Sequence, residues 1–401
     1  MNKIERIIKG SNVKRQYSSS NRDSHIWLFG EWFGKRCCDN SMYLANYVAL
    51  HHPEIQLYWA CFSECDISSL SNSVRVITIG SKEADDIYKT AGVVIMNQGF
   101  IDFSENGWNY FNGSITVNLW HGVMWKRIGH DGSKQSGLLY KSYVKANDSI
   151  FGADYYIATS EDYAKICESA FGAKPEQVIR AGYPRNSIFY QDDQLEKSRN
   201  EVLAVLRRET GVNWKSDVRI ITYMPTFRDS ADNSFSFMDL ADNTELQDWL
   251  EQSNTVILQK AHLITQQRRD MREGERHQRI IPFNNIPAQV LLAATDLLIT
   301  DYSSCFFDFL LLDRPIIHFI YDYDFYAHKD RGVYYEKGDV VCGDYAMTVE
   351  ELVPLIMENA KNPGKQHQLR TIRRDTLMQY DQSDSCEVIY KSICSHLTEE
   401  L

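Results

Sequence analysis

The sequence lacks the segments and motifs that mark several large classes of protein. It contains no apolar stretch of about 18 residues, so no membrane-spanning helix is expected. Residues 1–10 are charged and have no apolar core, so no signal peptide is predicted. The GxxxxGK(S/T) loop, the GxGxxG fingerprint, the HExxH motif and the EF-hand pattern are all missing. These absences argue against an ordinary nucleoside triphosphatase or dinucleotide enzyme, and we expect no metal and no cofactor.

The nine cysteines do not have the pattern of a disulfide framework. Their number is odd and several lie within apolar runs, which favours a reducing compartment. Cys61 and Cys65 are separated by three residues, but no second Cys or His pair with the spacing of a zinc site lies nearby. We therefore interpret both as structural residues of a cytoplasmic protein.

Positive charge is scarce overall and concentrated at one end. The formal net charge is −11, so a general nucleic-acid binder is not expected. Residues 1–36, however, hold eight basic side chains against three acidic ones. A basic N-terminus on an acidic protein favours contact with an anionic surface or a polyanion. The alternative is a solvated tail.

The length of 401 residues favours two domains over a single core. Apolar segments of strand length alternate with helical segments through both halves, which predicts parallel α/β sheets. We expect a basic arm at 1–24, a Rossmann-like domain at 25–190, a linker region at 191–217, a second Rossmann-like domain at 218–385 and a helical tail at 386–401. Two such doubly wound domains are expected to face a cleft and to bind ligands at the carboxyl ends of their strands.

The apolar runs give the positions of the strands. The predicted strands are 25–29, 55–62, 74–79, 92–96, 116–120 and 155–159 in the first half, and 218–223, 255–259, 280–283, 297–300 and 316–320 in the second.

The stretch 297–326 combines two of these strands with a polar turn. After the first strand come Asp301, Tyr302, Ser303 and Ser304, and an apolar segment at 306–312 then predicts a buried helix. Pro315 lies beyond the end of this helix, because proline cannot continue one. Hydroxyls and free amide N–H groups at a helix start form an anion site. The stretch therefore predicts a phosphate cradle at Ser303 and Ser304, with capping of the helix by the same hydroxyls as the alternative.

Four short segments that contain reactive or charged side chains lie at the ends of predicted strands. They are Trp120-His121-Gly122, Pro225-Thr226-Phe227-Arg228, Lys260-Ala261-His262 and Asp301-Tyr302-Ser303-Ser304. Because ligands of such folds bind at strand carboxyl ends, we expect one shared site. His121 could act there as a general base near neutral pH, and Gly122 beside it allows a close approach. The alternative is a hydrogen-bonded histidine in a turn.

Three further residues could surround a diphosphate. Arg228 offers a bidentate fork, Lys260 a point charge and His262 a polarisable ring. With the helix start at Ser303 and Ser304, they would stabilise the charge of a phosphoryl-transfer transition state or leaving group. The alternatives are a salt bridge of Arg228 to a nearby aspartate and solvent-facing side chains for Lys260 and His262.

Residues 126–149 combine basic side chains with interleaved apolar ones. This composition predicts either an amphipathic element that lies on anionic lipid or a packed helix with a solvated face.

Six groups of residues occur in order along residues 25–385. They are Gly34-Lys35 with Asp39-Asn40-Ser41 and Tyr43-Leu44, Leu119-Trp120-His121-Gly122 with Lys126 and Gly129, Gly182-Tyr183-Pro184-Arg185-Asn186, Pro225-Thr226-Phe227-Arg228, Lys260 with His262, and Thr300-Asp301-Tyr302-Ser303-Ser304 with Phe307-Asp308 and Pro315. Together they resemble the CDP-glycerol glycerophosphotransferase family, which includes teichoic-acid primases and polymerases and related capsule polymerases.

The resemblance implies a GT-B fold whose second domain binds most of the nucleotide. It also implies transfer of glycerol phosphate from CDP-glycerol to an acceptor hydroxyl, with release of CMP. His121 matches the general base of the family, and His262, Arg228, Ser303 and Ser304 match residues that hold the donor diphosphate. We therefore expect His121 and His262 to be catalytic, and Arg228, Lys260, Asp301, Ser303, Ser304, Lys126 and Arg185 to bind substrate.

Members of the family act on lipid-linked acceptors, which implies a peripheral location on the inner face of a bacterial cell membrane. This chain departs from the family at Val123, Met124 and Trp125, where a small polar residue and proline are usual, and at Gln382, where glycine often follows the aspartate. It has no large N-terminal extension, which favours a primase or a compact capsule enzyme. The alternatives are the same chemistry with CDP-ribitol, a GT-B glycosyltransferase that uses a sugar nucleotide, and a non-catalytic membrane-docked subunit that binds nucleotide or polymer.

Overall fold

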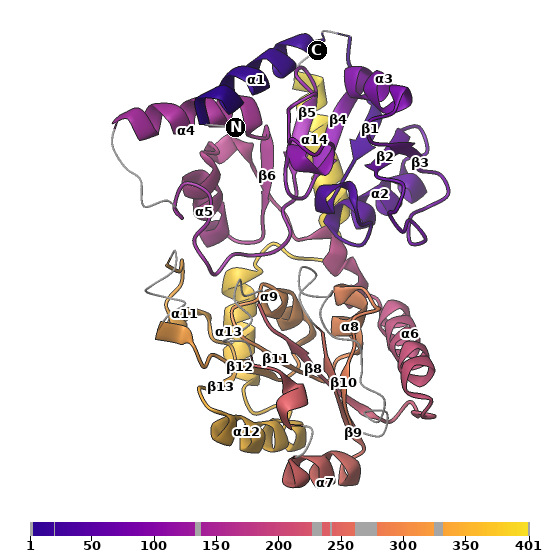
Figure 1. The fold of residues 1–401 in the computed structure, drawn as a ribbon, viewed down its shortest axis with the longest axis vertical. Helices are drawn as coiled ribbons and strands as arrows, with labels where there is room; N and C mark the ends of the chain where they lie inside the picture. The colour runs from indigo at the N-terminus through magenta and orange to yellow at the C-terminus, as the bar shows by residue number, and fades with distance from the viewer. Residues whose placement is uncertain are drawn as a thin grey trace. The chain divides into compact units, whose positions relative to one another are not determined.

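The computed structural model describes residues 3–19, 21–132, 138–226, 235–240, 243–260, 279–324 and 332–399. The chain divides into two compact α/β units (Figure 1). Unit 1 comprises Met1–Val123, Ile128–Ser187 and Gln379–Leu401, and unit 2 comprises Met124–Arg127 and Ile188–Met378. Both units contain a parallel sheet with helices on its two faces, which is the predicted α/β class.

The sheet of unit 1 has seven parallel strands in the order β3-β2-β1-β4-β5-β6-β7. The strands are β1 (Asp23–Phe29), β2 (Gln56–Cys61), β3 (Arg75–Thr78), β4 (Ala91–Met96), β5 (Ile115–Asn118), β6 (Tyr155–Ala158) and β7 (Val178–Arg180). The central strand β4 is buried along its whole length, as expected for a parallel strand covered on both faces.

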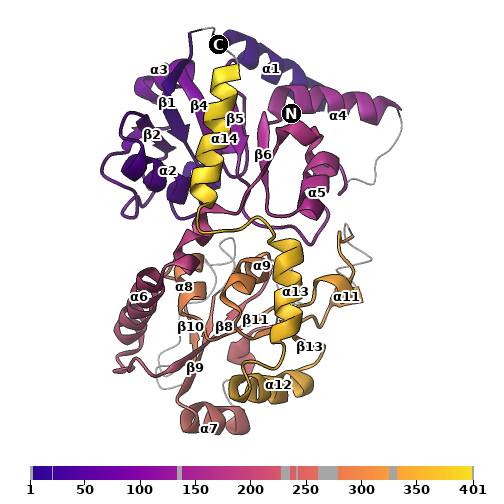
Figure 2. The same cartoon turned by 180° about the vertical axis from the view of Figure 1, so that it is seen from behind.

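Helices cover both faces of this sheet. They are α1 (Lys3–Gln16), α2 (Asn40–His51), α3 (Lys82–Thr90), α4 (Leu138–Phe151), α5 (Glu161–Phe171) and α14 (Ser385–Glu399), with short 3-10 turns at η1 (Trp32–Gly34), η2 (Phe100–Asp102) and η3 (Pro175–Gln177). The helices α2 and α14 pack beside each other on one face (Figure 2) and α3 packs on the other. Side chains of Ser81 and Ser160 cap α3 and α5, as the sequence predicts.

Unit 2 contains a six-stranded parallel sheet in the order β10-β9-β8-β11-β12-β13. The strands are β8 (Arg219–Met224), β9 (Thr255–Gln259), β10 (Ile280–Pro282), β11 (Leu297–Thr300), β12 (Ile316–Phe319) and β13 (Asp344–Ala346). The helices among its described residues are α6 (Asp192–Thr210), α7 (Thr244–Gln252), α8 (Ala288–Ala294), α9 (Cys305–Phe309), α11 (Lys337–Val340), α12 (Val349–Lys361) and α13 (His367–Leu377), with 3-10 turns at η6 (Phe237–Leu240) and η8 (Leu310–Leu312). The 3-10 turn η4 (Pro184–Tyr190) begins in unit 1 and ends in unit 2.

The eleven predicted strands are present, with ends that differ by a few residues. Two three-residue strands, β7 and β13, were not predicted. The region 191–217, expected to be a linker, contains the 19-residue helix α6, which buries Val202, Leu203 and Leu206 in unit 2. The arm expected at 1–24 forms helix α1 and the first residues of β1, and the tail forms α14 of unit 1. Within the described ranges, no helix has the length and apolar character needed to cross a membrane.

The order of strands places a topological switch point in each sheet. In unit 1 the chain builds outward from β1 to β3 and then returns to the other side of β1 with β4. In unit 2 the corresponding pair is β8 and β11. Ligands of open parallel sheets bind outside the carboxyl ends of strands at such a point. The loops that follow β1, β4, β8 and β11 are therefore the places to look for function.

Candidate active site

His121 lies in unit 1, just after β5, which is the neighbour of β4. Its ring is half-buried and stacks on the indole of Trp120, with ring centroids 4.4 Å apart. A second indole, that of Trp32 after β1, has its centroid 5.6 Å from the His121 ring. Trp120 has a φ of 56° and Gly122 a φ of 136°. The His121 loop therefore contains a tryptophan in a backbone conformation that side chains rarely adopt, which is typical of functional sites.

Two buried side chains donate hydrogen bonds to the backbone of this loop. Asn40 donates from Nδ2 to the carbonyl oxygen of Trp120 at 2.9 Å. Arg185 donates from Nη1 to the carbonyl oxygen of His121 at 3.0 Å and to Oδ1 of Asp39 at 2.9 Å. Its backbone N–H donates to Oδ1 of Asn40 at 3.2 Å. Arg185 was predicted to bind substrate, but the residue is only 7% exposed, and these contacts favour a role in positioning His121.

Carboxyl groups fix the neighbouring loops. Asp102 is fully buried and accepts hydrogen bonds from the backbone N–H groups of Phe33 at 2.9 Å, Asn97 at 2.9 Å and Gln98 at 2.8 Å. Burial raises the pKa of Asp102 to about 7, although these three N–H groups act in the opposite direction. Its carboxyl thereby joins the loop after β1 to the loop after β4.

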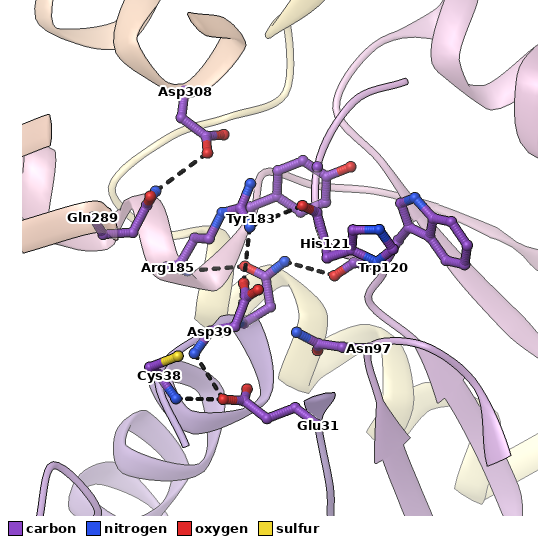
Figure 3. Close-up of polar contacts among 12 residues, drawn as sticks. Glu31, Cys38, Asp39, Asn97, Trp120, His121, Tyr183, Arg185, Gln289 and Asp308 are labelled. Carbon is purple, nitrogen blue, oxygen red and sulfur yellow. Dashed lines mark hydrogen bonds and ion pairs between the residues drawn. The ribbon is translucent and has the colours of Figure 1, made fainter. Parts of the chain in front are cut away.

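Glu31 has a comparable task at the start of α2. It is fully buried and accepts hydrogen bonds from the backbone N–H groups of Cys38 and Asp39 (Figure 3). Burial raises the pKa of Glu31 well above its usual range, and the charge of Asp39 adds to the effect. Asp39 itself caps α2, since its side chain accepts from the backbone N–H of Asn40.

At the switch point of unit 2, Asp301 joins the loops after β8 and β11. Its Oδ1 accepts from the backbone N–H of Thr226 at 2.7 Å, from the Thr226 hydroxyl at 2.6 Å and from the backbone N–H of Tyr302 at 2.6 Å. Asp301 is fully buried. It was predicted to bind substrate, but these contacts favour a part in shaping the loop that carries Ser303 and Ser304.

Ser303 and Ser304 are half-buried at the start of α9. Ser304 stands at the N-cap position, but its side chain makes no capping hydrogen bond. Capping by the Ser304 hydroxyl, the alternative to a phosphate cradle, is therefore not observed. The helix predicted at 306–312 consists of five α-helical residues followed by the 3-10 turn η8.

Lys260 follows β9 and is 5% exposed. Its Nζ donates to the carbonyl oxygens of Asn284 at 3.1 Å and Ile286 at 2.5 Å. The alternative of a solvent-facing Lys260 is therefore wrong, because the ammonium holds the loop between β10 and α8. Arg228 and His262, predicted to hold the donor and to act in catalysis, lie outside the described residues.

Lys126 belongs to a four-residue segment of the first half that is part of unit 2. It pairs with Val333 in an antiparallel bridge. Next to it, Trp125 is 1% exposed, donates from its indole N–H to the carbonyl oxygen of Tyr335 at 2.8 Å and meets the ring of Tyr302 edge-on. Trp125, one of the three residues at which the chain departs from the family pattern, is thus a core residue of unit 2. Of the described residues of the amphipathic element predicted at 126–149, those from Leu138 onward are helical and belong to α4.

The sequence did not single out Trp32, Glu31, Asp102 or Asn97. Trp32 and Phe33 have positive φ values of 46° and 60°, and their backbone N–H groups donate to Gln98 and Asp102, which are distant in sequence. A signal was present in the acidic residues Glu31 and Asp102, which stand among aromatic neighbours where a carboxyl group would be costly without hydrogen bonds. Among the residues that the structure describes, no group of three or more His, Cys, Asp or Glu side chains could hold a metal ion.

The two Rossmann-like units define a protein of the GT-B class. The solved structure of the wall teichoic acid polymerase TagF has this fold, with a TM-score of 0.78 at 23% identity over 100% of this chain and 98% of that chain. Residues 12–395 match the family described as CDP-Glycerol:Poly(glycerophosphate) glycerophosphotransferase, and the chain belongs to that family. The predicted fold class and family are thereby confirmed.

Curated relatives agree with this assignment. The chain is 30% identical over 284 residues to the teichoic acid poly(glycerol phosphate) polymerase of Bacillus spizizenii, covering 69% of each sequence. It is 26% identical over 382 residues to the teichoic acid glycerol-phosphate transferase of Staphylococcus aureus, covering 92% of this chain and 94% of that protein. The chain is thus an enzyme of the glycerophosphotransferase family.

Proposed function

We propose that this enzyme transfers glycerol phosphate from CDP-glycerol to a hydroxyl of a teichoic-acid or capsule-type acceptor and releases CMP. The observation that carries the proposal is the placement of His121. The histidine is half-buried at the carboxyl end of β5, and the residue before it, Trp120, has a left-handed backbone conformation. Arg185 and Asn40 donate hydrogen bonds to backbone carbonyl oxygens of this loop. Such a fixed, partly exposed imidazole is suited to general-base catalysis.

The proposed reaction is a displacement at the β-phosphorus of the donor. His121 accepts the proton of the acceptor hydroxyl as its oxygen forms a bond to the β-phosphorus. The bond from that phosphorus to the bridging oxygen breaks, and the electron pair leaves with CMP. The stabilisation of charge on a departing phosphate is the main task of the protein in such reactions.

The donor is assigned to unit 2. The start of α9 at Ser303 and Ser304 offers hydroxyls and amide N–H groups to a diphosphate, and Asp301 fixes the backbone just before it. The family resemblance leads us to propose Arg228 and His262 as further diphosphate ligands, and His262 also as a second catalytic residue. Lys260 supports the donor site through its hydrogen bonds to the carbonyl oxygens of Asn284 and Ile286.

The acceptor is proposed to be lipid-linked, and helix α1 is proposed to bind the inner face of the membrane that carries it. Ile4 and Ile8 are 72% and 56% exposed and stand one helical turn apart, beside the basic residues Lys3 and Lys9. Helix α1 packs on α4 (Figures 1 and 2), where Lys14 donates to the carbonyl oxygen of Ser149. Exposed apolar side chains flanked by lysines favour binding at an anionic membrane surface.

A donor screen tests the proposed function. The purified protein is incubated with CDP-glycerol, CDP-ribitol, a UDP-sugar or a GDP-sugar and an alkyl-anchored glycerol phosphate oligomer. Release of CMP with elongation of the oligomer from CDP-glycerol supports the proposal. CMP release from CDP-ribitol alone would assign the other alditol, UDP or GDP release from a nucleotide sugar would assign glycosyl transfer, and binding of a CDP-alditol without turnover would assign a non-catalytic subunit.

A further inference from the structure

The switch point of unit 1 carries two side-chain amides on one short loop after β4. Asn97 is fully buried, and its Oδ1 accepts from the Ser41 hydroxyl at 2.8 Å. The Oε1 of the next residue, Gln98, accepts from the backbone N–H of Trp32 at 2.7 Å. Within the described part of the chain, neither Nδ2 of Asn97 nor Nε2 of Gln98 has a hydrogen-bond partner, although both atoms are buried. Buried amide donors nearly always have an acceptor, so we expect each of these two nitrogens to donate to an oxygen atom of a ligand.

The same loops are held under strain. Trp32 and Phe33 are consecutive residues with left-handed φ values, and Gln98 and Asp102 hold their two backbone N–H groups. Asp102 accepts in addition from the N–H groups of Asn97 and Gln98, so one carboxyl fixes both the strained loop and the amide loop. Strained backbone of this kind persists only where surrounding contacts determine it, and it is common at ligand sites.

The position of these groups places them beside the proposed base. The Trp32 and His121 rings are 5.6 Å apart, and the indole N–H of Trp32 donates to Oδ2 of Asp39 at 2.8 Å, which orients the ring. In Figure 3, the side chain of Asn97 points from its strand toward the group formed by Asp39 and His121. The buried cation of this neighbourhood, Arg185, already pairs with Asp39, and the buried carboxyl groups of Glu31 and Asp102 also lie here, so the environment does not favour a diphosphate. A neutral, hydroxylated group fits it better.

We propose that Trp32, Asn97 and Gln98 form the subsite for the hydroxylated end of the acceptor. The two amides donate hydrogen bonds to its hydroxyl oxygens, and the face of Trp32 packs against its C–H groups. The ligand class is a polyol or sugar chain end whose reacting hydroxyl is presented to His121. This inference rests on the proposed function, since it names the acceptor site of that reaction.

Acceptor kinetics test the subsite with the full chain. The probe is the alkyl-anchored glycerol phosphate oligomer with saturating CDP-glycerol, and the variants are Gln98→Met and Asn97→Ala. Loss of one neutral hydrogen bond changes binding by roughly three- to tenfold. We expect each variant to raise the KM for the oligomer by that factor, while the KM for CDP-glycerol stays within a factor of two. The matched control is Asn109→Leu, since Asn109 is a buried amide of unit 1 whose Nδ2 donates to the carbonyl oxygen of Ile150. The control should leave the KM for the oligomer unchanged.

Unchanged KM for the oligomer in Gln98→Met would overturn the subsite, as would an equal rise in both KM values. Asn97 is fully buried, so Asn97→Ala could fail to fold; Gln98 is only half-buried, and its variant then decides the question. If the wild-type chain does not turn over CDP-glycerol, the proposed function fails by itself. Calorimetric binding of the oligomer to the wild type and to Gln98→Met then still tests the subsite, and equal affinities would overturn it. Competition by glycerol 3-phosphate, ribitol 5-phosphate or a disaccharide identifies the preferred chain end.

Discussion

The guanidinium of Arg185 donates to the carbonyl oxygen of His121 at a distance of 3.0 Å. The same Nη1 also donates to Asp39, the N-cap residue of α2, at 2.9 Å. The backbone of the proposed base is thereby tied to the start of a helix through one buried cation. The position of His121 is therefore fixed by hydrogen bonds to residues that are distant from it in sequence.

Arg185→Lys is expected to lower kcat without a comparable change in the KM for CDP-glycerol. Lysine keeps the charge, but its Nζ lies closer to the backbone than Nη1 of arginine, so it cannot keep the contacts that this one nitrogen makes to both partners. Loss of a hydrogen bond to a charged group costs about 1.5–3 kcal/mol, so we expect a decrease in kcat of roughly 10- to 100-fold. Steady-state kinetics measure it. Arg180→Lys is the matched control, because Arg180 forms an exposed pair with Glu161 and should leave kcat unchanged.

The stability of unit 1 should depend on pH through Asp102. Its pKa in the folded protein is about 7, whereas an unfolded chain has a value near 3.9. The folded state therefore holds a proton that the unfolded state releases, and the contribution of Asp102 to stability falls as the pH rises from about 4 to about 7. The loss between pH 5 and pH 7 is about 2 kcal/mol.

Urea unfolding of the wild type and of Asp102→Asn at pH 5, 6, 7 and 8 measures this effect. The asparagine does not titrate, so the wild type should lose stability relative to the variant as the pH rises. A constant difference between the two proteins, or a relative gain by the wild type, would show that Asp102 is ionised throughout this range.

The loop that carries Ser303 and Ser304 should depend on its tie to Thr226. In Thr226→Val the hydroxyl that donates to Asp301 at 2.6 Å is lost, while the size of the side chain is kept. We expect a rise of roughly three- to tenfold in the KM for CDP-glycerol, because the proposed diphosphate site loses support. Thr222→Val on the preceding strand β8 breaks a buried hydroxyl contact with Thr295 and should leave this KM unchanged. Equal effects of both substitutions would assign the change to β8 as a whole.

Helix α1 should decide binding to anionic vesicles. Burial of an isoleucine side chain contributes about 1.5–3 kcal/mol, so Ile4→Ser with Ile8→Ser should lower the vesicle partition coefficient by at least about tenfold. Sedimentation with vesicles of anionic and of neutral lipid measures it. Ile372→Ser is the control, because Ile372 is a 51% exposed isoleucine on α13 of unit 2. Unaltered partition of the double variant would remove α1 from the membrane-binding surface.

The sequence predicts the strands well because buried parallel strands are continuous apolar runs, such as Val93, Val94 and Ile95 of β4. The strands β7 and β13 were missed because Val178–Arg180 and Asp344–Ala346 are three residues long and partly polar. The linker region was placed at 191–217 because this stretch is polar and charged, and only the packing of α6 shows which of its residues are buried.

The candidate site could be predicted in part. The residues beside His121 already suggested a general base at this position, and the resemblance points to the same role, which stays a prediction. The positions of Lys260 and Asp301 at strand ends were also correct, but their burial and their hydrogen bonds to loop backbone depend on contacts with residues 24–75 positions away. For the same reason the sequence could not reveal that Asp102 joins Phe33 to Asn97, since a hydrogen-bond network across loops leaves no local pattern.

The rate of CMP release by His121→Ala tests the central claim most directly. The measurement uses CDP-glycerol with the glycerol phosphate oligomer, and His130→Ala is the control, because His130 pairs with Asp148 elsewhere in unit 1. Loss of a general base lowers the rate by roughly 10²- to 10⁴-fold. We expect His121→Ala to lose at least about 100-fold in kcat, with a nearly unchanged KM for CDP-glycerol, and His130→Ala to keep the wild-type rate. A near wild-type rate for His121→Ala would contradict the assignment of His121 as the base.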